Sequence, residues 1–269
     1  MHNFKKQFGQ NFLKNAKFAR LMVDKLELQP TDTVIEIGPG DGMVTKLLLE
    51  SGAKVIALEI DDDLIPKLSG KFANFTNFNL VHLSILDANI EEILNNANSG
   101  INVKVTGSLP YNISKKIIDM FIRFNTTNSK FVIKTCAFIV QEEVAKDYAA
   151  IAPKSSFLSN YSRIFAKVRK LESIPKYMFF PEPKVNGGIL RFEIKENMPS
   201  NFLELHKLMR VGFSNPRKTL SNNLKSSARY KVDNLEEIYK SIEIKPTARP
   251  AELEYEQWEK LANSLQTID

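Results

Sequence analysis

Residues 33–42 read T-V-I-E-I-G-P-G-D-G, and residues 43–50, M-V-T-K-L-L-L-E, follow directly. The first five residues form an apolar run that predicts a buried strand. Gly38, Gly40 and Gly42 then predict a tight turn, because glycine adopts backbone angles that other residues avoid. The last segment predicts a helix, whose first N–H groups would face a ligand at the turn. Strand, glycine turn and helix in this order predict a nucleotide site in an α/β sheet.

The glycine spacing and one acidic residue narrow the choice of ligand. The turn has the spacing G-x-G-x-G and not the G-x-G-x-x-G of dinucleotide enzymes. Glu36 lies inside the predicted strand, where a carboxylate is unusual unless it has a ligand or a hydrogen-bond partner. The pattern E-x-G-x-G-x-G resembles the first motif of S-adenosylmethionine-dependent methyltransferases.

Polar residues also end the next two predicted strands, residues 54–60 and 79–83. Glu59 follows the glycine turn by about 20 residues, where an acid can hold both hydroxyls of a ribose. Asp87 comes just after the third strand and can accept a hydrogen bond from an adenine amine. It is equally placed to cap the helix expected at residues 88–94.

A fourth strand, residues 101–105, leads into Ser108-Leu109-Pro110-Tyr111. Pro110 removes a backbone donor and forces Leu109 into an extended conformation, so nearby carbonyls would face outward. The Ser108 hydroxyl and the Leu109 carbonyl can then accept hydrogen bonds from an amine, while the Tyr111 ring stacks on a flat base. On its own the tetrad is consistent with a simple turn at a strand end. Its position on the same sheet as the glycine turn favours a substrate site.

The rest of the chain completes a two-part organisation. We expect helices at residues 113–124 and 141–148, strands at 130–140, 161–171 and 186–194, and a loop near the site at 149–159. The last two strands are joined without a long crossover, which predicts an antiparallel edge. Beyond Pro199 the periodicity is helical, at residues 202–213, 220–227, 235–241 and 255–265. The N-terminal segment, residues 5–13, is too short and mixed for a core element.

Composition excludes several classes of protein. The 269 residues contain a single cysteine, Cys136, so there is no internal disulfide, and its apolar neighbours indicate a core position. Three scattered histidines argue against a metal site. The N-terminus lacks the apolar region of a secretory signal, and no apolar run is long enough for a membrane span.

The net charge of +6 favours a polyanionic partner, and the cations are concentrated in one segment. Residues 205–232 contain seven lysines and arginines and no acid. Such a cluster is typical of a surface that binds a phosphate backbone, although a solvated helix face has the same composition. The candidate RNA-binding residues are Lys207, Arg210, Arg217, Lys218 and Lys225.

Six motifs together resemble the KsgA-type ribosomal RNA adenine N6-dimethyltransferases. They are F-G-Q-N-F-L (residues 8–13), E-I-G-P-G-D-G (36–42), L-E-I-D (58–61), L-P-Y-N-I-S (109–114), F-F-P-E-P-K-V (179–185) and P-R-K-T-L (216–220). The resemblance implies a Rossmann-like seven-stranded methyltransferase domain (residues 1–198, with an arm at 1–13) and a small helical RNA-binding domain (199–269). It implies S-adenosyl-L-methionine as cofactor and dimethylation of two adjacent adenines in the 3′-terminal stem-loop of small-subunit rRNA, during ribosome assembly.

The resemblance also assigns residues to roles. The tetrad Ser108, Leu109, Pro110 and Tyr111 would be catalytic, and Phe179 or Phe180 would stack on the other face of the base. The cofactor would be held by Gln10, Asn11, Leu13, Glu36, Gly38, Gly40, Gly42, Glu59, Ile60, Asp87 and Ser108. The expected partner is the rRNA of a pre-30S-type particle, and we expect a cytoplasmic monomer without a metal.

One departure from the family matters. The family usually has Asn before Leu-Pro-Tyr, whereas this chain has Ser108, which is shorter and offers one polar atom instead of two. The broader pattern of amino-methyltransferases admits Asp, Asn or Ser there. Two alternatives remain, namely an Erm-type enzyme that modifies large-subunit rRNA and an RNA-binding assembly factor without catalytic activity. The P-R-K-T-L segment and the Leu before Pro110 argue against the first.

Overall fold

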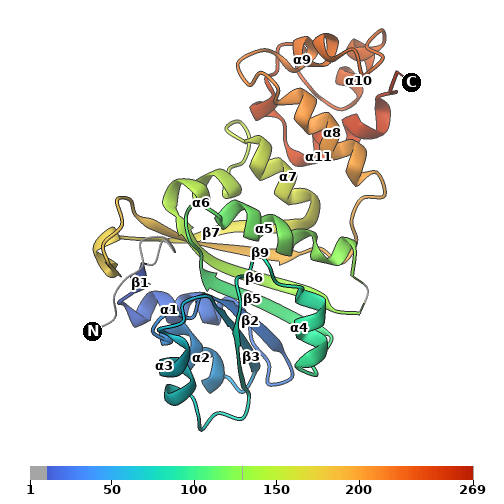
Figure 1. The fold of residues 1–269 in the computed structure, drawn as a ribbon. Helices are drawn as coiled ribbons and strands as arrows, with labels where there is room; N and C mark the ends of the chain where they lie inside the picture. The colour runs from blue at the N-terminus through green and yellow to red at the C-terminus, as the bar shows by residue number, and fades with distance from the viewer. Residues whose placement is uncertain (1–10, 129, 269) are drawn as a thin grey trace. The chain divides into compact units, whose positions relative to one another are not determined.

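The computed structural model describes residues 11–128 and 130–268, in which seven strands form one sheet (Figure 1). Their order across the sheet is β4-β3-β2-β5-β6-β9-β7. The strands are β2 (Thr33–Ile37), β3 (Lys54–Glu59), β4 (Phe78–His82), β5 (Asn102–Ser108), β6 (Val132–Gln141), β7 (Ala166–Ile174) and β9 (Gly187–Ile194). The predicted α/β class with a Rossmann-like seven-stranded sheet is confirmed.

The parallel part of the sheet is organised around β2. This strand pairs in parallel with β3 on one side and β5 on the other, and all five of its residues are buried. The chain adds β3 and β4 on the first side and then returns to add β5 and β6 on the second. The direction of the connections therefore reverses between β2 and β5. In open α/β sheets the ligand binds at this point, beyond the carboxyl ends of the strands.

Helices cover both faces of the sheet. They are α1 (Ala16–Asp24), α2 (Met43–Glu50), α3 (Ile65–Lys71), α4 (Ile90–Asn96), α5 (Ser114–Arg123) and α6 (Glu142–Ala149). In Figure 1, α1, α2 and α3 lie on one face and α5 lies on the other, as right-handed crossovers on the two sides of β2 require. Met22, Leu48 and Val55 are fully buried in one apolar cluster. Cys136 is buried in β6, as expected for a core residue.

The edge of the sheet beyond β6 differs in part from our prediction. We expected a loop up to residue 159 and a strand at residues 161–171, but a helix, α7 (Phe157–Phe165), precedes β7. The Ser156 hydroxyl accepts a hydrogen bond from the Ser159 N–H at 3.0 Å, and the Ser156 N–H donates to the Ser159 hydroxyl at 2.9 Å. This reciprocal cap starts a helix where weak alternation suggested a strand. β9 lies between β6 and β7 and runs antiparallel to β6.

A separate two-stranded sheet links the start of the described chain to the segment after β7. β1 (Phe12–Leu13) pairs antiparallel with β8 (Phe179–Phe180), so that Phe12 lies opposite Phe180 and Leu13 opposite Phe179. Our expectation that residues 5–13 form no core element is wrong for Leu13, which is only 6% exposed. Its partner strand is more than 160 residues away, and local composition does not reveal such a pairing.

Two element ends also differ from the prediction. β5 continues to Ser108, which lies opposite Ile139 of β6, so the strand does not end at residue 105. α4 is capped by Asn89, whose side chain accepts a hydrogen bond from the Glu92 N–H at 3.3 Å. Asp87 therefore does not cap this helix.

The chain divides into two compact units. One comprises Met1–Ala145 with Arg169–Ile194, and the other Lys146–Val168 with Lys195–Asp269. The second unit contains α7 together with α8 (Phe202–Gly212), α9 (Leu220–Ser227), α10 (Leu235–Ser241) and α11 (Tyr255–Ser264). Its core includes Trp258, which is fully buried and stacks on Phe213 with ring centroids 5.5 Å apart. No helix in residues 11–128 or 130–268 is long and apolar enough to cross a membrane.

Candidate active site

A cavity of about 310 Å³ lies at the carboxyl ends of the parallel strands. Its walls come from the segments that follow β2, β3, β4 and β5, and from β1 and β8. The lining residues are 11–13, 36–41, 43–44, 58–60, 83–86, 108–113 and 179. Four strand ends that are separate in the sequence thus meet in one site, as the prediction from βα spacing requires.

The glycine turn after β2 forms one wall. Gly40 has a φ of +60°, and a Cβ at this position would lie 3.1 Å from the Phe12 ring. Gly42, with a φ of +80°, is the N-cap of α2, and a Cβ there would lie 2.7 Å from the Phe72 ring. The positive φ angles favour glycine at both positions, and at Gly42 a Cβ would also force the Phe72 ring to move. Gly38 and Gly40 line the cavity, whereas Gly42 does not.

Glu59 connects the end of β3 to this turn. Its carboxylate accepts hydrogen bonds from the N–H groups of Ile60 and Asp61, both at 2.9 Å, and of Gly40 at 3.4 Å. The side chain is only 4% exposed, and burial raises the pKa of its carboxyl while the three N–H groups oppose this shift. The carboxylate is therefore held in a fixed position at the cavity wall.

Glu36 presents a buried carboxyl to the same cavity. The residue is 1% exposed, and among the described residues its Oε2 atom has no hydrogen-bond partner. Burial raises the pKa of Glu36 to about 8; Thr45 opposes this shift, while the nearby carboxylates of Glu59 and Asp41 add to it. A buried polar atom without a partner is costly, so an unpaired carboxyl oxygen at the edge of the cavity fits a ligand that brings a hydrogen-bond donor.

The tetrad that begins at the last residue of β5 forms another part of the cavity wall. The Leu109 N–H donates to the Ile139 carbonyl at 2.9 Å, which fixes the chain as it leaves the sheet. The carbonyls of Pro110 and Tyr111 accept hydrogen bonds from the Ile113 N–H at 3.2 Å and the Ser114 hydroxyl at 3.3 Å. Within the described parts of the chain, no hydrogen bond to the Leu109 carbonyl is found. This carbonyl and the Ser108 hydroxyl are two acceptors that the tetrad can offer to a substrate.

Three aromatic residues, Phe12, Tyr111 and Phe179, line the cavity. Tyr111 is partly buried, and its hydroxyl, which has no partner among the described residues, has its pKa raised by burial. Phe179 is 1% exposed and lines the cavity. Phe180, the other candidate for stacking, is 53% exposed and does not line it.

Most of the predicted site residues come together in this cavity. Those that line it are Asn11, Leu13, Glu36, Gly38, Gly40, Glu59, Ile60, Ser108, Leu109, Pro110, Tyr111 and Phe179. Asp87 is exposed and lies outside the lining, as does Gly42, and Gln10 lies outside the described residues.

Sequence reasoning missed several lining residues. Phe12, Ser84, Ile85, Leu86 and Asn112 belong to the wall. We selected Asp87 after β4 for its charge, whereas the uncharged residues just before it face the cavity.

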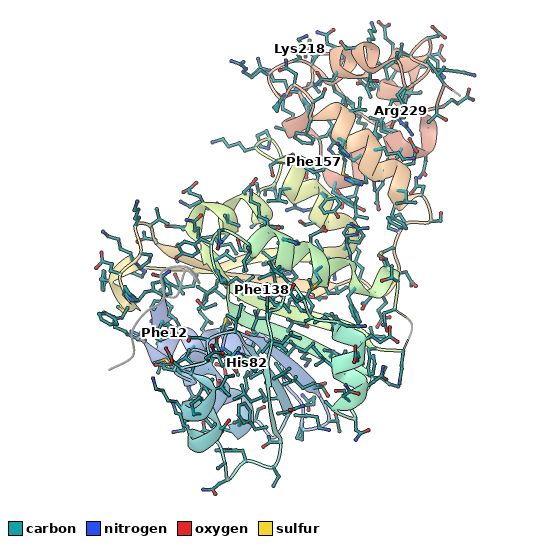
Figure 2. The ribbon with its side chains drawn as sticks, in the orientation of Figure 1. Phe12, His82, Phe138, Phe157, Lys218 and Arg229 are labelled. Atoms are coloured by element: carbon teal, nitrogen blue, oxygen red, sulfur yellow. The ribbon has the colours of Figure 1, made fainter. Side chains whose placement is uncertain are left out.

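The predicted RNA-binding cations lie in the second unit. Lys207, Arg210, Arg217, Lys218 and Lys225 are exposed. Glu204, one residue before the acid-free segment, partly offsets the cluster, since it bonds Lys207 at 3.5 Å and Arg229 at 3.1 Å. Lys218 and Arg229 are labelled in Figure 2. In the described parts of the chain, no group of three or more potential metal ligands occurs.

The sheet order and the cavity at the ends of β2, β3, β4 and β5 are those of a Rossmann-like methyltransferase. The family model described as ribosomal RNA adenine dimethylase matches residues 1–267. The chain belongs to this family. It is therefore an rRNA adenine methyltransferase, and its methyl donor is S-adenosyl-L-methionine.

Individual relatives and solved structures agree with this assignment. The chain is 35% identical to Ribosomal RNA small subunit methyltransferase A of Lactococcus lactis subsp. lactis (strain IL1403), over 98% of this chain and 90% of that protein. It is 34% identical to the protein of the same name from Streptococcus mutans serotype c, over 99% and 93%.

Two crystal structures are similar over nearly their whole length. The dimethyladenosine transferase from Plasmodium falciparum superposes with a TM-score of 0.74 at 25% identity, over 93% of this chain and 95% of that chain. The 23S rRNA methyltransferase ErmE has a TM-score of 0.79 at 22% identity, over 94% and 98%, and shows the shared fold.

Proposed function

We propose that the chain dimethylates N6 of two adjacent adenines in the 3′-terminal stem-loop of small-subunit rRNA, within a pre-30S-type particle. The observation that carries this proposal is that Glu59 and the Ser108–Tyr111 tetrad line the same cavity. An acidic residue placed to bind the ribose of a nucleotide and a site for a flat substrate with an amino group therefore lie in one cavity. The names of the relatives from Lactococcus and Streptococcus support the small subunit as the source of the rRNA.

The residues on one side of the cavity fit S-adenosyl-L-methionine. Glu59 would accept hydrogen bonds from both ribose hydroxyls, because its carboxylate is fixed at the end of the second parallel strand. The unpartnered Oε2 of Glu36 would accept a hydrogen bond from the ammonium group. Asn11, Leu13, Gly38, Gly40 and Ile60 would complete the cofactor site. Ser84–Leu86 are better placed than Asp87 to contact the adenine ring, since they line the cavity and Asp87 does not.

The residues on the other side fit an adenine that has left its stack. Enzymes that act on a base extrude it into a pocket, where it stacks on aromatic side chains. Tyr111 and Phe179 would hold the two faces of the ring, and both line the cavity. Ser108 and the Leu109 carbonyl would accept hydrogen bonds from N6.

Methyl transfer then depends on positioning and on hydrogen bonds to the amine. The cofactor supplies an electrophilic methyl group on a sulfonium. The lone pair of N6 is delocalised into the adenine ring, so the amine is a weak nucleophile. Acceptors at Ser108 and Leu109 would favour the tetrahedral form of N6, in which the lone pair is available, and would hold it in line with the methyl group. Burial of the aromatic walls would keep water from the reacting atoms.

The helical C-terminal part would bind the rRNA backbone. This proposal concerns residues 199–269, which include the exposed cations on α8, α9 and the connection between them. Cations that neutralise phosphates release counterions, which makes binding dependent on salt. We further propose that the enzyme acts as a monomer in the cytoplasm, where pre-30S-type particles assemble.

A tritium-transfer assay tests the function. Undermethylated small subunits, large subunits and S-adenosyl-L-[methyl-³H]methionine are incubated with the parent chain and with Glu59→Ala. We expect label in adenine N6 of the small-subunit RNA, none in the large subunit, and a strong loss with Glu59→Ala. Label in the large subunit would favour an Erm-type enzyme.

A second candidate function rests on Ser108, which replaces the usual Asn of the family. A chain that binds the cofactor and the small subunit but transfers no label would be an assembly factor. The same assay, combined with a binding measurement, separates these two outcomes.

A further inference from the structure

The segment between β7 and β9 exposes large apolar side chains. Tyr177 is 59% exposed, Phe180 53% and Val185 41%. Contiguous exposed apolar side chains on a folded surface mark interaction sites. Phe180 belongs to β8, and Tyr177 belongs to the short 3₁₀ turn just before it.

Hydrogen bonds hold the backbone of this segment. The Lys14 N–H donates to the Met178 carbonyl at 2.8 Å, and the Lys176 N–H donates to the Asn186 side chain at 3.1 Å. Phe179 is buried against Gly187, where a Cβ would lie 2.9 Å from the ring. The buried Phe179 thus anchors the segment on which Tyr177 and Phe180 are exposed.

The exposed rings are continuous with the cavity. Phe12 lies directly opposite Phe180 in the two-stranded sheet, so the two side chains are on the same face of it. Phe12, which is labelled in Figure 2, lines the cavity and contacts the glycine turn at Gly40. Phe12 at the cavity and Phe180 outside it therefore form one continuous aromatic face of this sheet, whereas Phe179 points to the opposite face.

The charges around these rings favour a polyanion. Lys14, Lys176 and Lys184 are exposed, and the one acid in residues 175–186, Glu182, is bonded to Lys176 at 2.9 Å. Aromatic rings bordered by cations are the surface that binds single-stranded nucleic acid, because bases stack on the rings while phosphates contact the cations.

We propose that Tyr177 and Phe180 form a stacking platform for the nucleotides that flank the target adenine in rRNA. This inference rests on the proposed function and extends it to the recognition of the substrate. A nucleotide extruded into the cavity leaves its neighbours unstacked, and rings at the cavity rim would compensate for the lost stacking. Phe180 thereby acquires a role outside the cavity, while Phe179 acts inside it.

Steady-state kinetics on undermethylated small subunits test the platform. In Tyr177→Ala and Phe180→Ala, we expect the KM for subunits to rise roughly 5- to 100-fold, with kcat at saturation and cofactor affinity unchanged. The slope of log KM against log salt should stay as in the parent, because no charge is removed. Tyr177→Phe keeps the ring and should retain the parent KM.

Ile101→Ala is the matched control for the loss of an exposed apolar side chain. Ile101 is 66% exposed and precedes β5 at the amino end of the sheet, away from the cavity. The proposal of a stacking platform is wrong if Tyr177→Ala and Phe180→Ala keep the parent KM, or if Ile101→Ala raises the KM by the same factor.

A binding measurement separates this inference from the catalytic proposal. In Phe180→Trp, an RNA stem-loop with the sequence of the small-subunit 3′ end should quench the fluorescence of the introduced indole, by stacking. The parent, whose only tryptophan, Trp258, is fully buried, gives the background. Quenching without methyl transfer by the parent would overturn the proposed function and keep the platform. No quenching, with an active parent, would overturn the platform alone.

Discussion

The Glu59 carboxylate accepts a hydrogen bond from the Gly40 N–H at 3.4 Å, and so joins the end of β3 to the glycine turn after β2. Nineteen residues of sequence separate the two groups, but the parallel register places both strand ends at the same edge of the sheet. This contact orients the acid and shapes the turn at the same time. Removing the Glu59 carboxylate should therefore disturb the cofactor site more than removing the carboxylate of an exposed acid would.

The first prediction concerns Glu59. We expect Glu59→Ala to weaken the binding of S-adenosyl-L-methionine by about 1.5–3 kcal/mol, the range for hydrogen bonds to a charged group. Titration calorimetry measures this change. Asp62→Ala is the control, because the Asp62 side chain is 78% exposed and does not line the cavity. Unchanged affinity in folded Glu59→Ala would refute the assignment.

The second prediction concerns the pH dependence of stability, through Glu36. In the folded, cofactor-free protein its carboxyl keeps a proton up to pH about 8, whereas in the unfolded chain it loses the proton near pH 4.5. The folded state therefore binds more protons between these values, and stability falls as pH rises from 4.5 to 8. The loss is on the order of 3 kcal/mol at pH 7.

Glu36→Gln removes this titration. We expect denaturant unfolding of the variant to show a weaker decline between pH 5 and 8 than the parent shows. The two pH profiles should become parallel only well above pH 8, where the carboxyl is ionised in both the folded and the unfolded state. Equal slopes in the parent and the variant between pH 5 and 8 would contradict the burial argument.

The third prediction concerns the acceptors for N6. Ser108→Ala removes one neutral hydrogen bond, worth about 0.5–1.5 kcal/mol, so single-turnover methyl transfer should slow only a few-fold. Tyr111→Ala should slow it more, because base stacking contributes about 1–3 kcal/mol. Ser108→Asn, which restores the usual residue of the family, should equal or exceed the parent rate if the cavity has room. If Ser108→Ala matches the parent while Tyr111→Ala is inactive, the Leu109 carbonyl is the acceptor that matters.

The fourth prediction concerns the cations near the start of α9. Neutralising Arg217 and Lys218 as glutamines should weaken small-subunit binding and flatten the plot of log affinity against log salt, because fewer counterions are released. The same change at Lys240 and Lys260, exposed cations on α10 and α11, is the matched control. If the slope of log affinity against log salt stays at the parent value, the cations near Arg217 and Lys218 do not bind RNA and are only a solvated helix face.

Local sequence patterns alone determined much of the site. The run from residue 33 to 50 has the predicted strand and helix with the expected bounds, Thr33–Ile37 and Met43–Glu50. The reason is that an apolar run, a glycine turn and a helical period are all encoded within a few residues. Parallel βα units then bring successive strand ends to one edge, so Glu59 and Ser108 could be placed in one cavity before the structure was known.

The tertiary structure decided the features that depend on distant partners. Pairing of β1 with β8 requires two segments far apart in the sequence to meet, and each strand has only two residues, too few for a periodic pattern. The structure also shows that Phe179, and not Phe180, lines the cavity. Adjacent side chains on a strand point to opposite sides, and the packing of Phe179 against Gly187 sets which of the two is buried. The prediction also placed Asp87 in the cavity, whereas the structure places it outside the lining. Its charge suggested a role, but the direction of the backbone decides which side chain faces the ligand.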